Sequence, residues 1–221
     1  MTAYTETVAA LAGELDSVAQ VLGSLSVGQW SSPTLLVPGG PVPNWTVLEL
    51  AGHLGFAMNM IDTLLSEESA LAPVLDRVSF FDQPRERIAP LAYRTARDVA
   101  VGMSGVEILD LCATSFSVPV ERARLVDPAF VGSTVLGAMR IDEFIATRVV
   151  EAVVHGLDLA QALDRSFTPS QAAVNCVADV LDSLGRRKGV ARPESLADDW
   201  LWVQVASGRL RHDEFPTPLL G

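Results

Sequence analysis

The most constraining feature of this sequence is a long apolar run with helical periodicity that carries a few polar side chains on one face. Glu151 and His155 are four residues apart, so their side chains are neighbours on a helix. Arg148 lies three residues before the glutamate, and Asp158 lies three residues after the histidine. A carboxylate and an imidazole are costly to bury without a partner. A divalent metal ion is one such partner.

Composition limits the classes of protein that this chain can belong to. The chain has 221 residues, of which 49% are hydrophobic, which is ample for a core in one large domain. The net charge of −11 argues against nucleic acid and against an anionic membrane surface as partners. No signal peptide or transmembrane run is evident, and Cys112 and Cys176 lie in apolar helical contexts. We therefore expect a cytoplasmic protein with reduced cysteines.

The hydrophobic pattern predicts an all-α fold in which long antiparallel helices form a bundle. Helices are expected over residues 3–25, 47–65, 106–124, 138–162, 169–187 and 194–210, with a further one starting near Pro84. Glycines and prolines predict a loop over residues 26–44. Pro90 is expected to kink or split its helix. A strand at Trp202–Val205 competes with the last helix, because aromatic and β-branched residues favour strands.

A third metal ligand is available on another helix. Thr46 and Glu49 have the spacing of a capping box, which begins a helix whose apolar face includes His53. If this helix lies beside the one with Glu151 and His155, two imidazoles and one carboxylate converge. Three protein ligands with an open position are typical of catalytic zinc, although nickel, cobalt and iron accept the same donors. On spacing alone, core histidines remain the favoured interpretation.

Two separate segments resemble the mycothiol-dependent maleylpyruvate isomerase family. They are Pro43-Asn44-Trp45-Thr46-Val47-x-x-Leu50-x-x-His53-Leu54 and Arg148-x-x-Glu151-x-x-x-His155-x-x-Asp158-Leu159. The resemblance covers residues 1–165 and implies a DinB-like four-helix bundle. It also implies that His53, Glu151 and His155 are metal ligands, normally for zinc. In this family the metal is thought to activate the thiol of mycothiol, the low-molecular-weight thiol of actinobacteria.

The resemblance implies an enzyme that uses mycothiol to act on a small electrophile, as an S-transferase or a cis–trans isomerase. The isomerase has a C-terminal α/β domain, whereas residues 166–221 of this chain predict only a short, mainly helical extension. The metal site therefore carries over better than the isomerase activity. Two alternatives stay open: a non-catalytic metal-binding bundle that acts as a sensor or binding module, and a metal-free scaffold with core histidines.

Three further side chains are candidates for supporting the site or binding the substrate. Asp158 is positioned to accept a hydrogen bond from a ligand imidazole, or else to pair with a surface cation. Arg148 either clamps a substrate carboxylate or neutralises a nearby acid, and the second role is favoured. Arg209 resembles the end of some family members' C-terminal regions and is expected to reach the site. Since bundles of this type often pair through exposed apolar helix faces, a homodimer is a further expectation.

Overall fold

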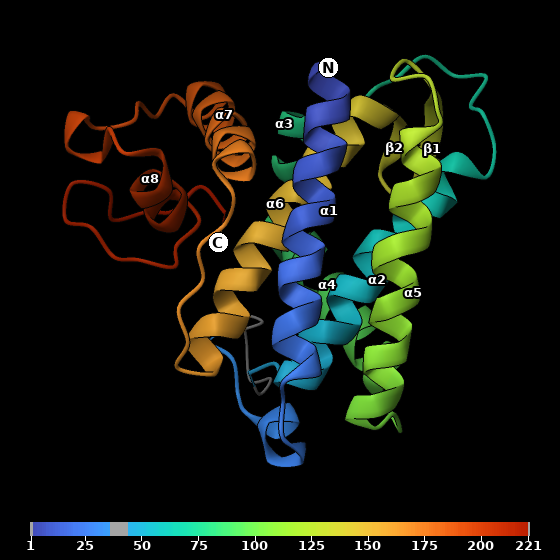
Figure 1. Cartoon of the computed structure of the whole chain (residues 1–221). Helices are drawn as coiled ribbons and strands as arrows, with labels where there is room; N and C mark the ends of the chain where they lie inside the picture. Colours follow the sequence, from blue (N-terminus) through green and yellow to red (C-terminus); the bar gives the residue numbers. More distant parts are fainter. Residues whose placement is uncertain (1, 36–43, 221) are drawn as a thin grey trace.

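The computed structural model describes residues 2–35 and 44–220, which form a helical bundle with α7 and α8 at one side (Figure 1). The helices of this described part are α1 (Ala3–Gly23), α2 (Val47–Leu65), α3 (Arg77–Phe81), α4 (Arg85–Ala100), α5 (Gly105–Arg124), α6 (Ile141–Ala162), α7 (Gln171–Arg187) and α8 (Asp199–Ala206). Two short 3-10 turns, η1 (Val27–Ser31) and η2 (Glu194–Leu196), and a hairpin of β1 (Val131–Thr134) and β2 (Gly137–Arg140) accompany them. The prediction of a mainly helical bundle is confirmed.

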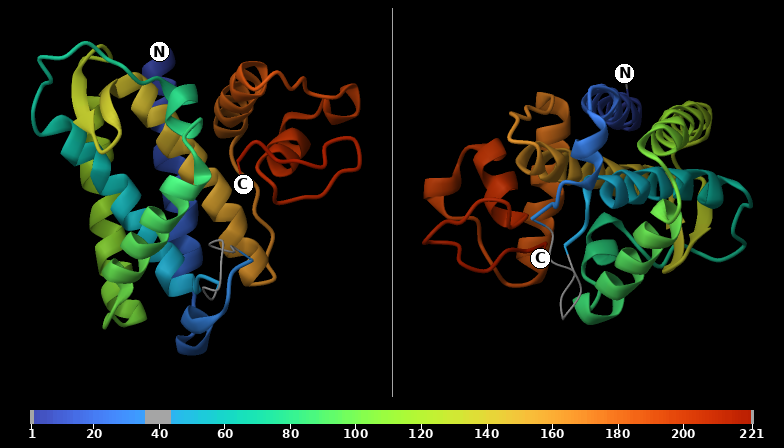
Figure 2. Two further views of the ribbon diagram at one scale, coloured as in Figure 1. Left: turned by 180° about the vertical axis from the view of Figure 1, so that it is seen from behind. Right: turned by 90° about the horizontal axis from the view of Figure 1, so that it is seen from below.

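The bundle consists of α1, α2, α5 and α6. Helices α1 and α2 each pack against both α5 and α6, and α4 covers α2. The view from below in Figure 2 shows α1 and α5 nearly end-on, with α7 and α8 beside the bundle. Apolar side chains from all four helices are fully buried between them, including Leu11, Leu54, Ile108 and Val149. This core fixes the relative position of α2 and α6, the two helices on which the predicted ligands lie.

Helix α2 starts where the capping box predicts. The backbone N–H of Glu49 donates to Thr46 Oγ1 at 3.2 Å, and the backbone N–H of Thr46 donates to Glu49 Oε2 at 2.8 Å. The preceding residue is also fixed, because Thr34 donates its backbone N–H to the Trp45 carbonyl at 2.7 Å. The box therefore sets the register of His53. Part of the loop expected over residues 26–44 lies outside the described residues, and its described part contains η1.

The approach to α6 differs from the prediction of a helix starting near residue 138. Residues 131–140 form the antiparallel hairpin, in which Val131 pairs with Arg140, and α6 begins only at Ile141. The hairpin packs against the end of α2 so closely that a Cβ on Gly132 would overlap the Leu64 carbonyl oxygen. Strands of four residues are too short to show a clear alternating pattern, which explains why the sequence gives no sign of them.

Two helices continue through a proline. Pro90 lies inside α4 and Pro119 lies inside α5, and both helices are continuous in the described structure. Of the two expectations for Pro90, a kink or a split, the split is therefore wrong. Helix α4 is packed along α2, and such packing holds a helix together where one backbone hydrogen bond is missing.

The C-terminal region is less helical than predicted. In place of one helix over residues 194–210, the chain forms η2 and the short α8, and the competing strand at Trp202–Val205 is wrong because these residues are helical. Gly208 has a φ of +82°, a left-handed conformation that suits glycine and ends the helix. The chain then turns back, with the backbone N–H of Arg209 donating to the Gln204 carbonyl at 2.8 Å. This turn brings Arg209 to α6.

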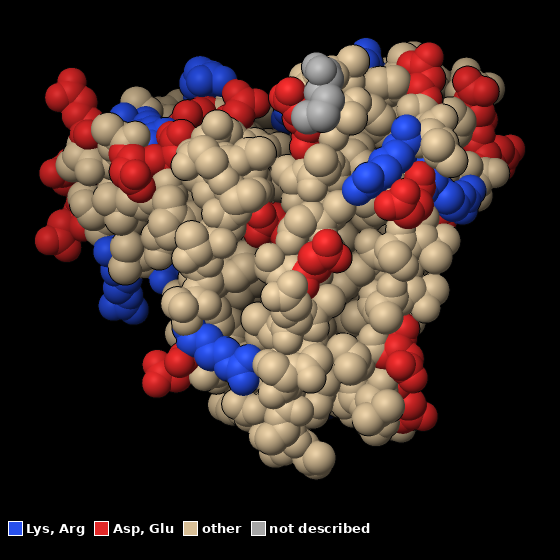
Figure 3. Space-filling view, in the orientation of Figure 1, with Lys and Arg blue, Asp and Glu red and all other residues tan. Residues whose placement is uncertain are grey.

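Charged side chains lie in separate patches on the face shown in Figure 3, with broad uncharged areas between them. Within residues 2–35 and 44–220, no single helix is long and apolar enough to cross a membrane. One pair, Ile88–Ala100 with Gly105–Arg124, satisfies the length and composition criteria jointly but is bent by 115°.

Candidate metal centre

Helices α2 and α6 bring the three predicted ligands together. His53 comes from the second turn of α2, and Glu151 and His155 come from successive turns of α6. The Nε2 atom of His53 lies 3.3 Å from Glu151 Oε2, and the Nε2 atom of His155 lies 3.2 Å from the same oxygen. The two imidazole rings meet edge to face, with centroids 5.0 Å apart. Residues separated by 98 positions in the chain thus point their donor atoms at one place.

The donor set fits a divalent metal ion. One ligand atom from each of His53, Glu151 and His155 lies within 4.8 Å of the other two. The three side chains are only 12%, 17% and 13% exposed, so they are largely shielded from bulk water. Two imidazole nitrogens and a carboxylate oxygen leave at least one position of a tetrahedral ion open. These residues can hold a metal ion, and the donors alone do not select which one.

A chain of hydrogen bonds fixes the orientation of His155. Its Nδ1 atom lies 2.8 Å from Asp158 Oδ2, so its Nε2 atom faces Glu151. Asp158 is 3% exposed and also accepts two hydrogen bonds from Arg209, from Nε at 2.9 Å and from Nη2 at 2.8 Å. Arg209 is held in turn by Gln161, which donates to its carbonyl at 3.1 Å. Asp158 therefore contacts both kinds of partner that the sequence suggests for it, an imidazole and a cation. The cation is Arg209, which was expected to reach the site.

The electrostatics of the triad suit a cation. Burial has the largest influence on the pKa of Glu151 and would raise it, but hydrogen bonds with His155 and His53 outweigh burial and hold this pKa well below its usual value. Burial lowers the pKa of His53 and is only partly opposed by Glu151. Burial would also lower the pKa of His155, but hydrogen bonds with Asp158 and Glu151 raise it to about 9. Near pH 7, Glu151 is therefore ionised and His53 is neutral, whereas His155 is protonated and would have to release its proton to act as a metal ligand.

Arg148 lies on the same helix, and its charge helps to lower the pKa of Glu151, but it forms no close ion pair with the triad. Its guanidinium carbon is 4.6 Å from the centroid of the Phe144 ring and 5.2 Å from that of Phe80. Its Nη1 atom donates to the Ala57 carbonyl at 3.1 Å, and its Nε atom donates to Thr147 Oγ1 at 3.2 Å. Among the described side chains, no carboxylate lies within ion-pairing distance of it.

A cavity of about 440 Å³ opens above the triad, between α2, α3, α4, α6 and the C-terminal segment. His53, Glu151 and His155 form part of its wall, together with Arg148 and Arg209. The structure thus brings all six sequence-predicted site residues together, because Asp158 lies directly behind His155 and Arg209. The third histidine of the chain, His212, is not part of the group that can hold a metal ion.

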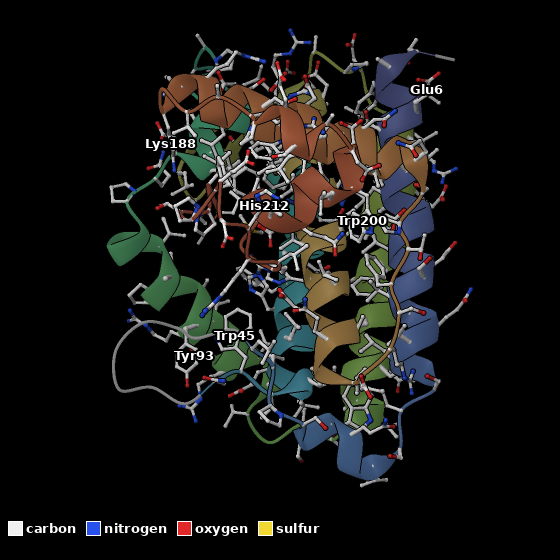
Figure 4. All side chains as sticks on the ribbon, turned by 90° about the vertical axis from the view of Figure 1, so that its left-hand side faces the viewer. Glu6, Trp45, Tyr93, Lys188, Trp200 and His212 are labelled. Atoms are coloured by element: carbon white, nitrogen blue, oxygen red, sulfur yellow. The ribbon has the colours of Figure 1, made fainter. Side chains whose placement is uncertain are left out.

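Sequence reasoning did not assign roles to two side chains at the cavity. The ring centroid of Trp45 lies 4.9 Å from that of His53 and 6.3 Å from that of His155. Figure 4 shows Trp45 beside Tyr93 of α4, with Lys188 above Trp45 on the same side of the molecule. Trp45 and Lys188 both line the cavity. The position of Trp45 in the motif that precedes α2 could have indicated its place near the site. Nothing in the sequence links Lys188 to α6.

The fold and the site together define a helical-bundle protein with a triad of two histidines and one glutamate that can bind a metal ion. The sequence profile of the mycothiol maleylpyruvate isomerase N-terminal domain family matches residues 11–160. The chain therefore belongs to that family, which confirms the resemblance seen in the sequence.

Solved structures share the fold. The chain resembles the crystal structure of the mycothiol-dependent maleylpyruvate isomerase with a TM-score of 0.60 and 15% identity, over 87% of this chain and 77% of that one. A single-residue mutant of the same enzyme matches with a TM-score of 0.60 and 14% identity, over the same shares of the two chains. At these identities the likeness establishes the fold alone. A search of curated proteins returned no match.

Proposed function

We propose that this protein is a zinc-dependent enzyme that uses a low-molecular-weight thiol, mycothiol, to act on a small electrophile. The observation that carries the proposal is the convergence of His53, Glu151 and His155 at the wall of a cavity of about 440 Å³. A buried metal site that opens into a cavity has room for an exogenous ligand at its free position. Membership of the isomerase family is the reason for choosing a thiol as that ligand.

A zinc ion at this site would supply one effect, which is to favour the deprotonated, nucleophilic form of a bound thiol near neutral pH. The protein's own residues would supply the remaining conditions. His53 and His155 would present Nε2 atoms as ligands, and Asp158 would hold the ring of His155 in place. The apolar wall of the cavity would exclude water from the thiolate.

The reaction follows from thiolate chemistry. The sulfur forms a bond to the β-carbon of a double bond that is conjugated to a carbonyl group, and the π electrons move to the carbonyl oxygen. The former double bond is then single and can rotate. Expulsion of the thiolate restores the double bond as the other isomer, whereas protonation of the α-carbon retains the thioether. These two outcomes correspond to isomerisation and to S-transfer.

Metal content is the first test. We expect the purified protein to contain about one zinc per chain by elemental mass spectrometry, as a three-ligand site binds one ion. The double variant His53→Ala/His155→Ala should contain almost none. The matched control is His212→Ala, which removes the third histidine but leaves the triad intact. Equal, negligible zinc in the wild type and the double variant would overturn the proposal.

Thiol consumption is the second test. The zinc-loaded protein is incubated with mycothiol and either a bimane or a chlorodinitrobenzene reagent, and loss of free thiol is followed over time. We expect a rate above background that disappears when zinc is removed by a chelator and returns when zinc is restored. A protein that binds zinc but shows no such rate across several electrophiles would be a metal-binding module without catalysis.

A further inference from the structure

The Arg148 guanidinium has unused hydrogen-bonding capacity at the cavity wall. The residue is 2% exposed, and its guanidinium group lies close to the rings of Phe80 and Phe144. Only two of its five N–H groups have acceptors, the Ala57 carbonyl and Thr147 Oγ1. A buried arginine is normally paired with a carboxylate. Here Glu151 interacts with it electrostatically, but no carboxylate of the described residues lies at ion-pairing distance. The remaining N–H groups are available to an anion that enters the cavity.

Lys188 is a second cation without a carboxylate partner. It lies at the end of α7, lines the same cavity, and donates its Nζ proton to the Leu219 carbonyl at 3.2 Å. No ion pair of Lys188 occurs within residues 2–35 and 44–220. By contrast, Arg209 at the cavity wall is neutralised by Asp158. Arg148 and Lys188 therefore place two cations without carboxylate partners in the wall of one cavity, in a chain with a net charge of −11.

The rest of the cavity wall is mainly apolar. Apolar side chains from several helices, the β1–β2 turn and the C-terminal segment contribute to it, including Phe56, Met60, Phe81, Leu91, Leu136 and Leu220. Such a wall favours an apolar body over a small, strongly hydrated molecule. A volume of about 440 Å³ has room for an aryl-sized group.

We infer that the electrophile is an apolar molecule with a single carboxylate, which Arg148 binds through its free N–H groups while the apolar body lies against the aromatic wall. This inference rests on the proposed function for the electrophilic role of the ligand, but the binding of such a carboxylate does not require it. Arg148 is then a residue that determines specificity. Lys188 adds long-range attraction for the same negative charge.

Binding of unreactive probes tests the inference without any chemistry. The protein, with its metal, is titrated with 4-phenylbutanoate and with the uncharged 4-phenylbutanamide, and binding is followed by calorimetry and by tryptophan fluorescence, to which Trp45 at the cavity wall contributes. We expect the acid to bind at least about tenfold more tightly than the amide, as a charged hydrogen bond to arginine implies. Propanoate, which lacks the aryl group, should bind at least about tenfold more weakly than 4-phenylbutanoate. Equal affinity for acid and amide would overturn the inference.

Variants separate Arg148 from the metal as the anion-binding group. In Arg148→Gln the affinity for the acid should fall about tenfold while that for the amide stays unchanged, and Arg148→Lys should retain part of the preference. Lys188→Gln should weaken binding of the acid by a smaller factor. The matched control is Arg165→Gln, an exposed arginine outside the cavity wall. A preference for the acid that survives in Arg148→Gln but is lost on metal removal would assign the carboxylate to the metal and overturn the inference.

Circular dichroism and thermal unfolding establish whether each variant folds. If Arg148→Gln does not fold, the ratio of the affinities of the wild type for the acid and the amide, and the response of Lys188→Gln, still decide the question.

A final comparison uses 4-oxo-4-phenylbut-2-enoate and its methyl ester as electrophiles with mycothiol. A higher kcat/KM for the acid supports the inference, and a preference for the ester contradicts it. Absence of any thiol reaction would overturn only the proposed function, because probe binding is measured separately.

Discussion

At the scale of single residues, Asp158 controls how the triad is presented to a metal ion. It accepts from His155 on one side and from Arg209 on the other, and it is almost fully buried. Carboxylates in this position fix the ring of a ligand histidine and raise its basicity, and their loss lowers metal affinity by about 10–100-fold. We therefore expect Asp158 to affect metal affinity through the orientation of His155.

We predict that Asp158→Asn lowers zinc affinity by about 10–100-fold while leaving the fold intact. The amide keeps the size of the side chain but loses the charge that pairs with Arg209 and His155. Competition with a fluorescent zinc chelator measures the affinity. Asp16→Asn, an exposed aspartate on α1, is the matched control. An unchanged affinity in Asp158→Asn would show that the orientation of His155 does not depend on the carboxylate.

The sequence predicts the site residues as far as local spacing reaches. Glu151 and His155 follow from a four-residue step on one helix, and the register of His53 follows from the cap at Thr46. The contact of Arg209 with Asp158 depends on a chain reversal after α8 and spans 51 positions. Rules based on the spacing of residues along one helix cannot relate two residues so far apart in the chain. The resemblance supplied Arg209 as a candidate without supplying its partner.

At the scale of elements, the hairpin and the short α3 position the ends of the helices that carry the site. The hairpin closes on the end of α2 through an isolated bridge between Glu68 and Gly132. The sequence predicted the long helices because each has a continuous apolar face. The hairpin and the split of residues 194–210 into η2 and α8 were missed, since short elements are determined by tertiary contacts more than by local pattern.

We predict that Gly132→Ala destabilises the protein by about 1–3 kcal/mol, because the new methyl group would overlap the Leu64 carbonyl. Denaturation in urea measures the change in the free energy of unfolding. Gly13→Ala is the control, since a Cβ on Gly13 meets nothing within 4 Å and α1 should gain about 0.5–1 kcal/mol from alanine. Equal effects of the two substitutions would contradict the close packing of the hairpin on α2.

Helix α3 is anchored to α6 by one ion pair. Arg77 donates to Glu143 from Nε at 2.9 Å, from Nη2 at 2.9 Å and from its backbone N–H at 2.9 Å. Burial would raise the pKa of Glu143, but the hydrogen bonds from Arg77 outweigh burial and hold the pKa below its usual value of 4.5. A carboxyl group with a lowered pKa in the folded state stabilises the protein above its unfolded pKa. That contribution is lost as the pH falls through the folded value.

We therefore predict that Glu143→Gln destabilises the protein by about 1 kcal/mol at pH 7, and that the difference shrinks as the pH falls below about 4.5. Urea denaturation of wild type and variant at pH values from 7 to 3 measures this convergence. Glu121→Gln is the matched control, because its ion pair with Arg124 is largely exposed and should contribute little at any pH. A constant difference over the whole pH range would exclude the ion pair as the cause.

At the scale of the whole molecule, residues 166–221 are not attached by a single contact. Helix α7 packs on both α1 and α6, and the backbone N–H of Ser170 donates to the buried carboxylate of Glu14 at 2.8 Å. The buried apolar side chains form one continuous cluster that includes Leu15 of α1 and Leu181 of α7. With Arg209 at the metal site, the C-terminal segment completes both the core and the cavity wall.

One core shared by both segments leads to a prediction about cooperativity. Trp30 and Trp45 report on the bundle, and Trp200 and Trp202 of α8 report on the C-terminal segment. Because separate units with separate cores unfold independently, we predict one urea transition with the same midpoint in a Trp30→Phe/Trp45→Phe variant and in a Trp200→Phe/Trp202→Phe variant, after correction for the effect of each substitution on stability. Far-ultraviolet circular dichroism should coincide with fluorescence in both. Two transitions, with the earlier one reported by Trp200 and Trp202, would instead make residues 1–165 and 166–221 separate units, as the sequence alone suggests. In that case Arg209 would leave Asp158 before the triad unfolds, and zinc affinity would fall with the first transition.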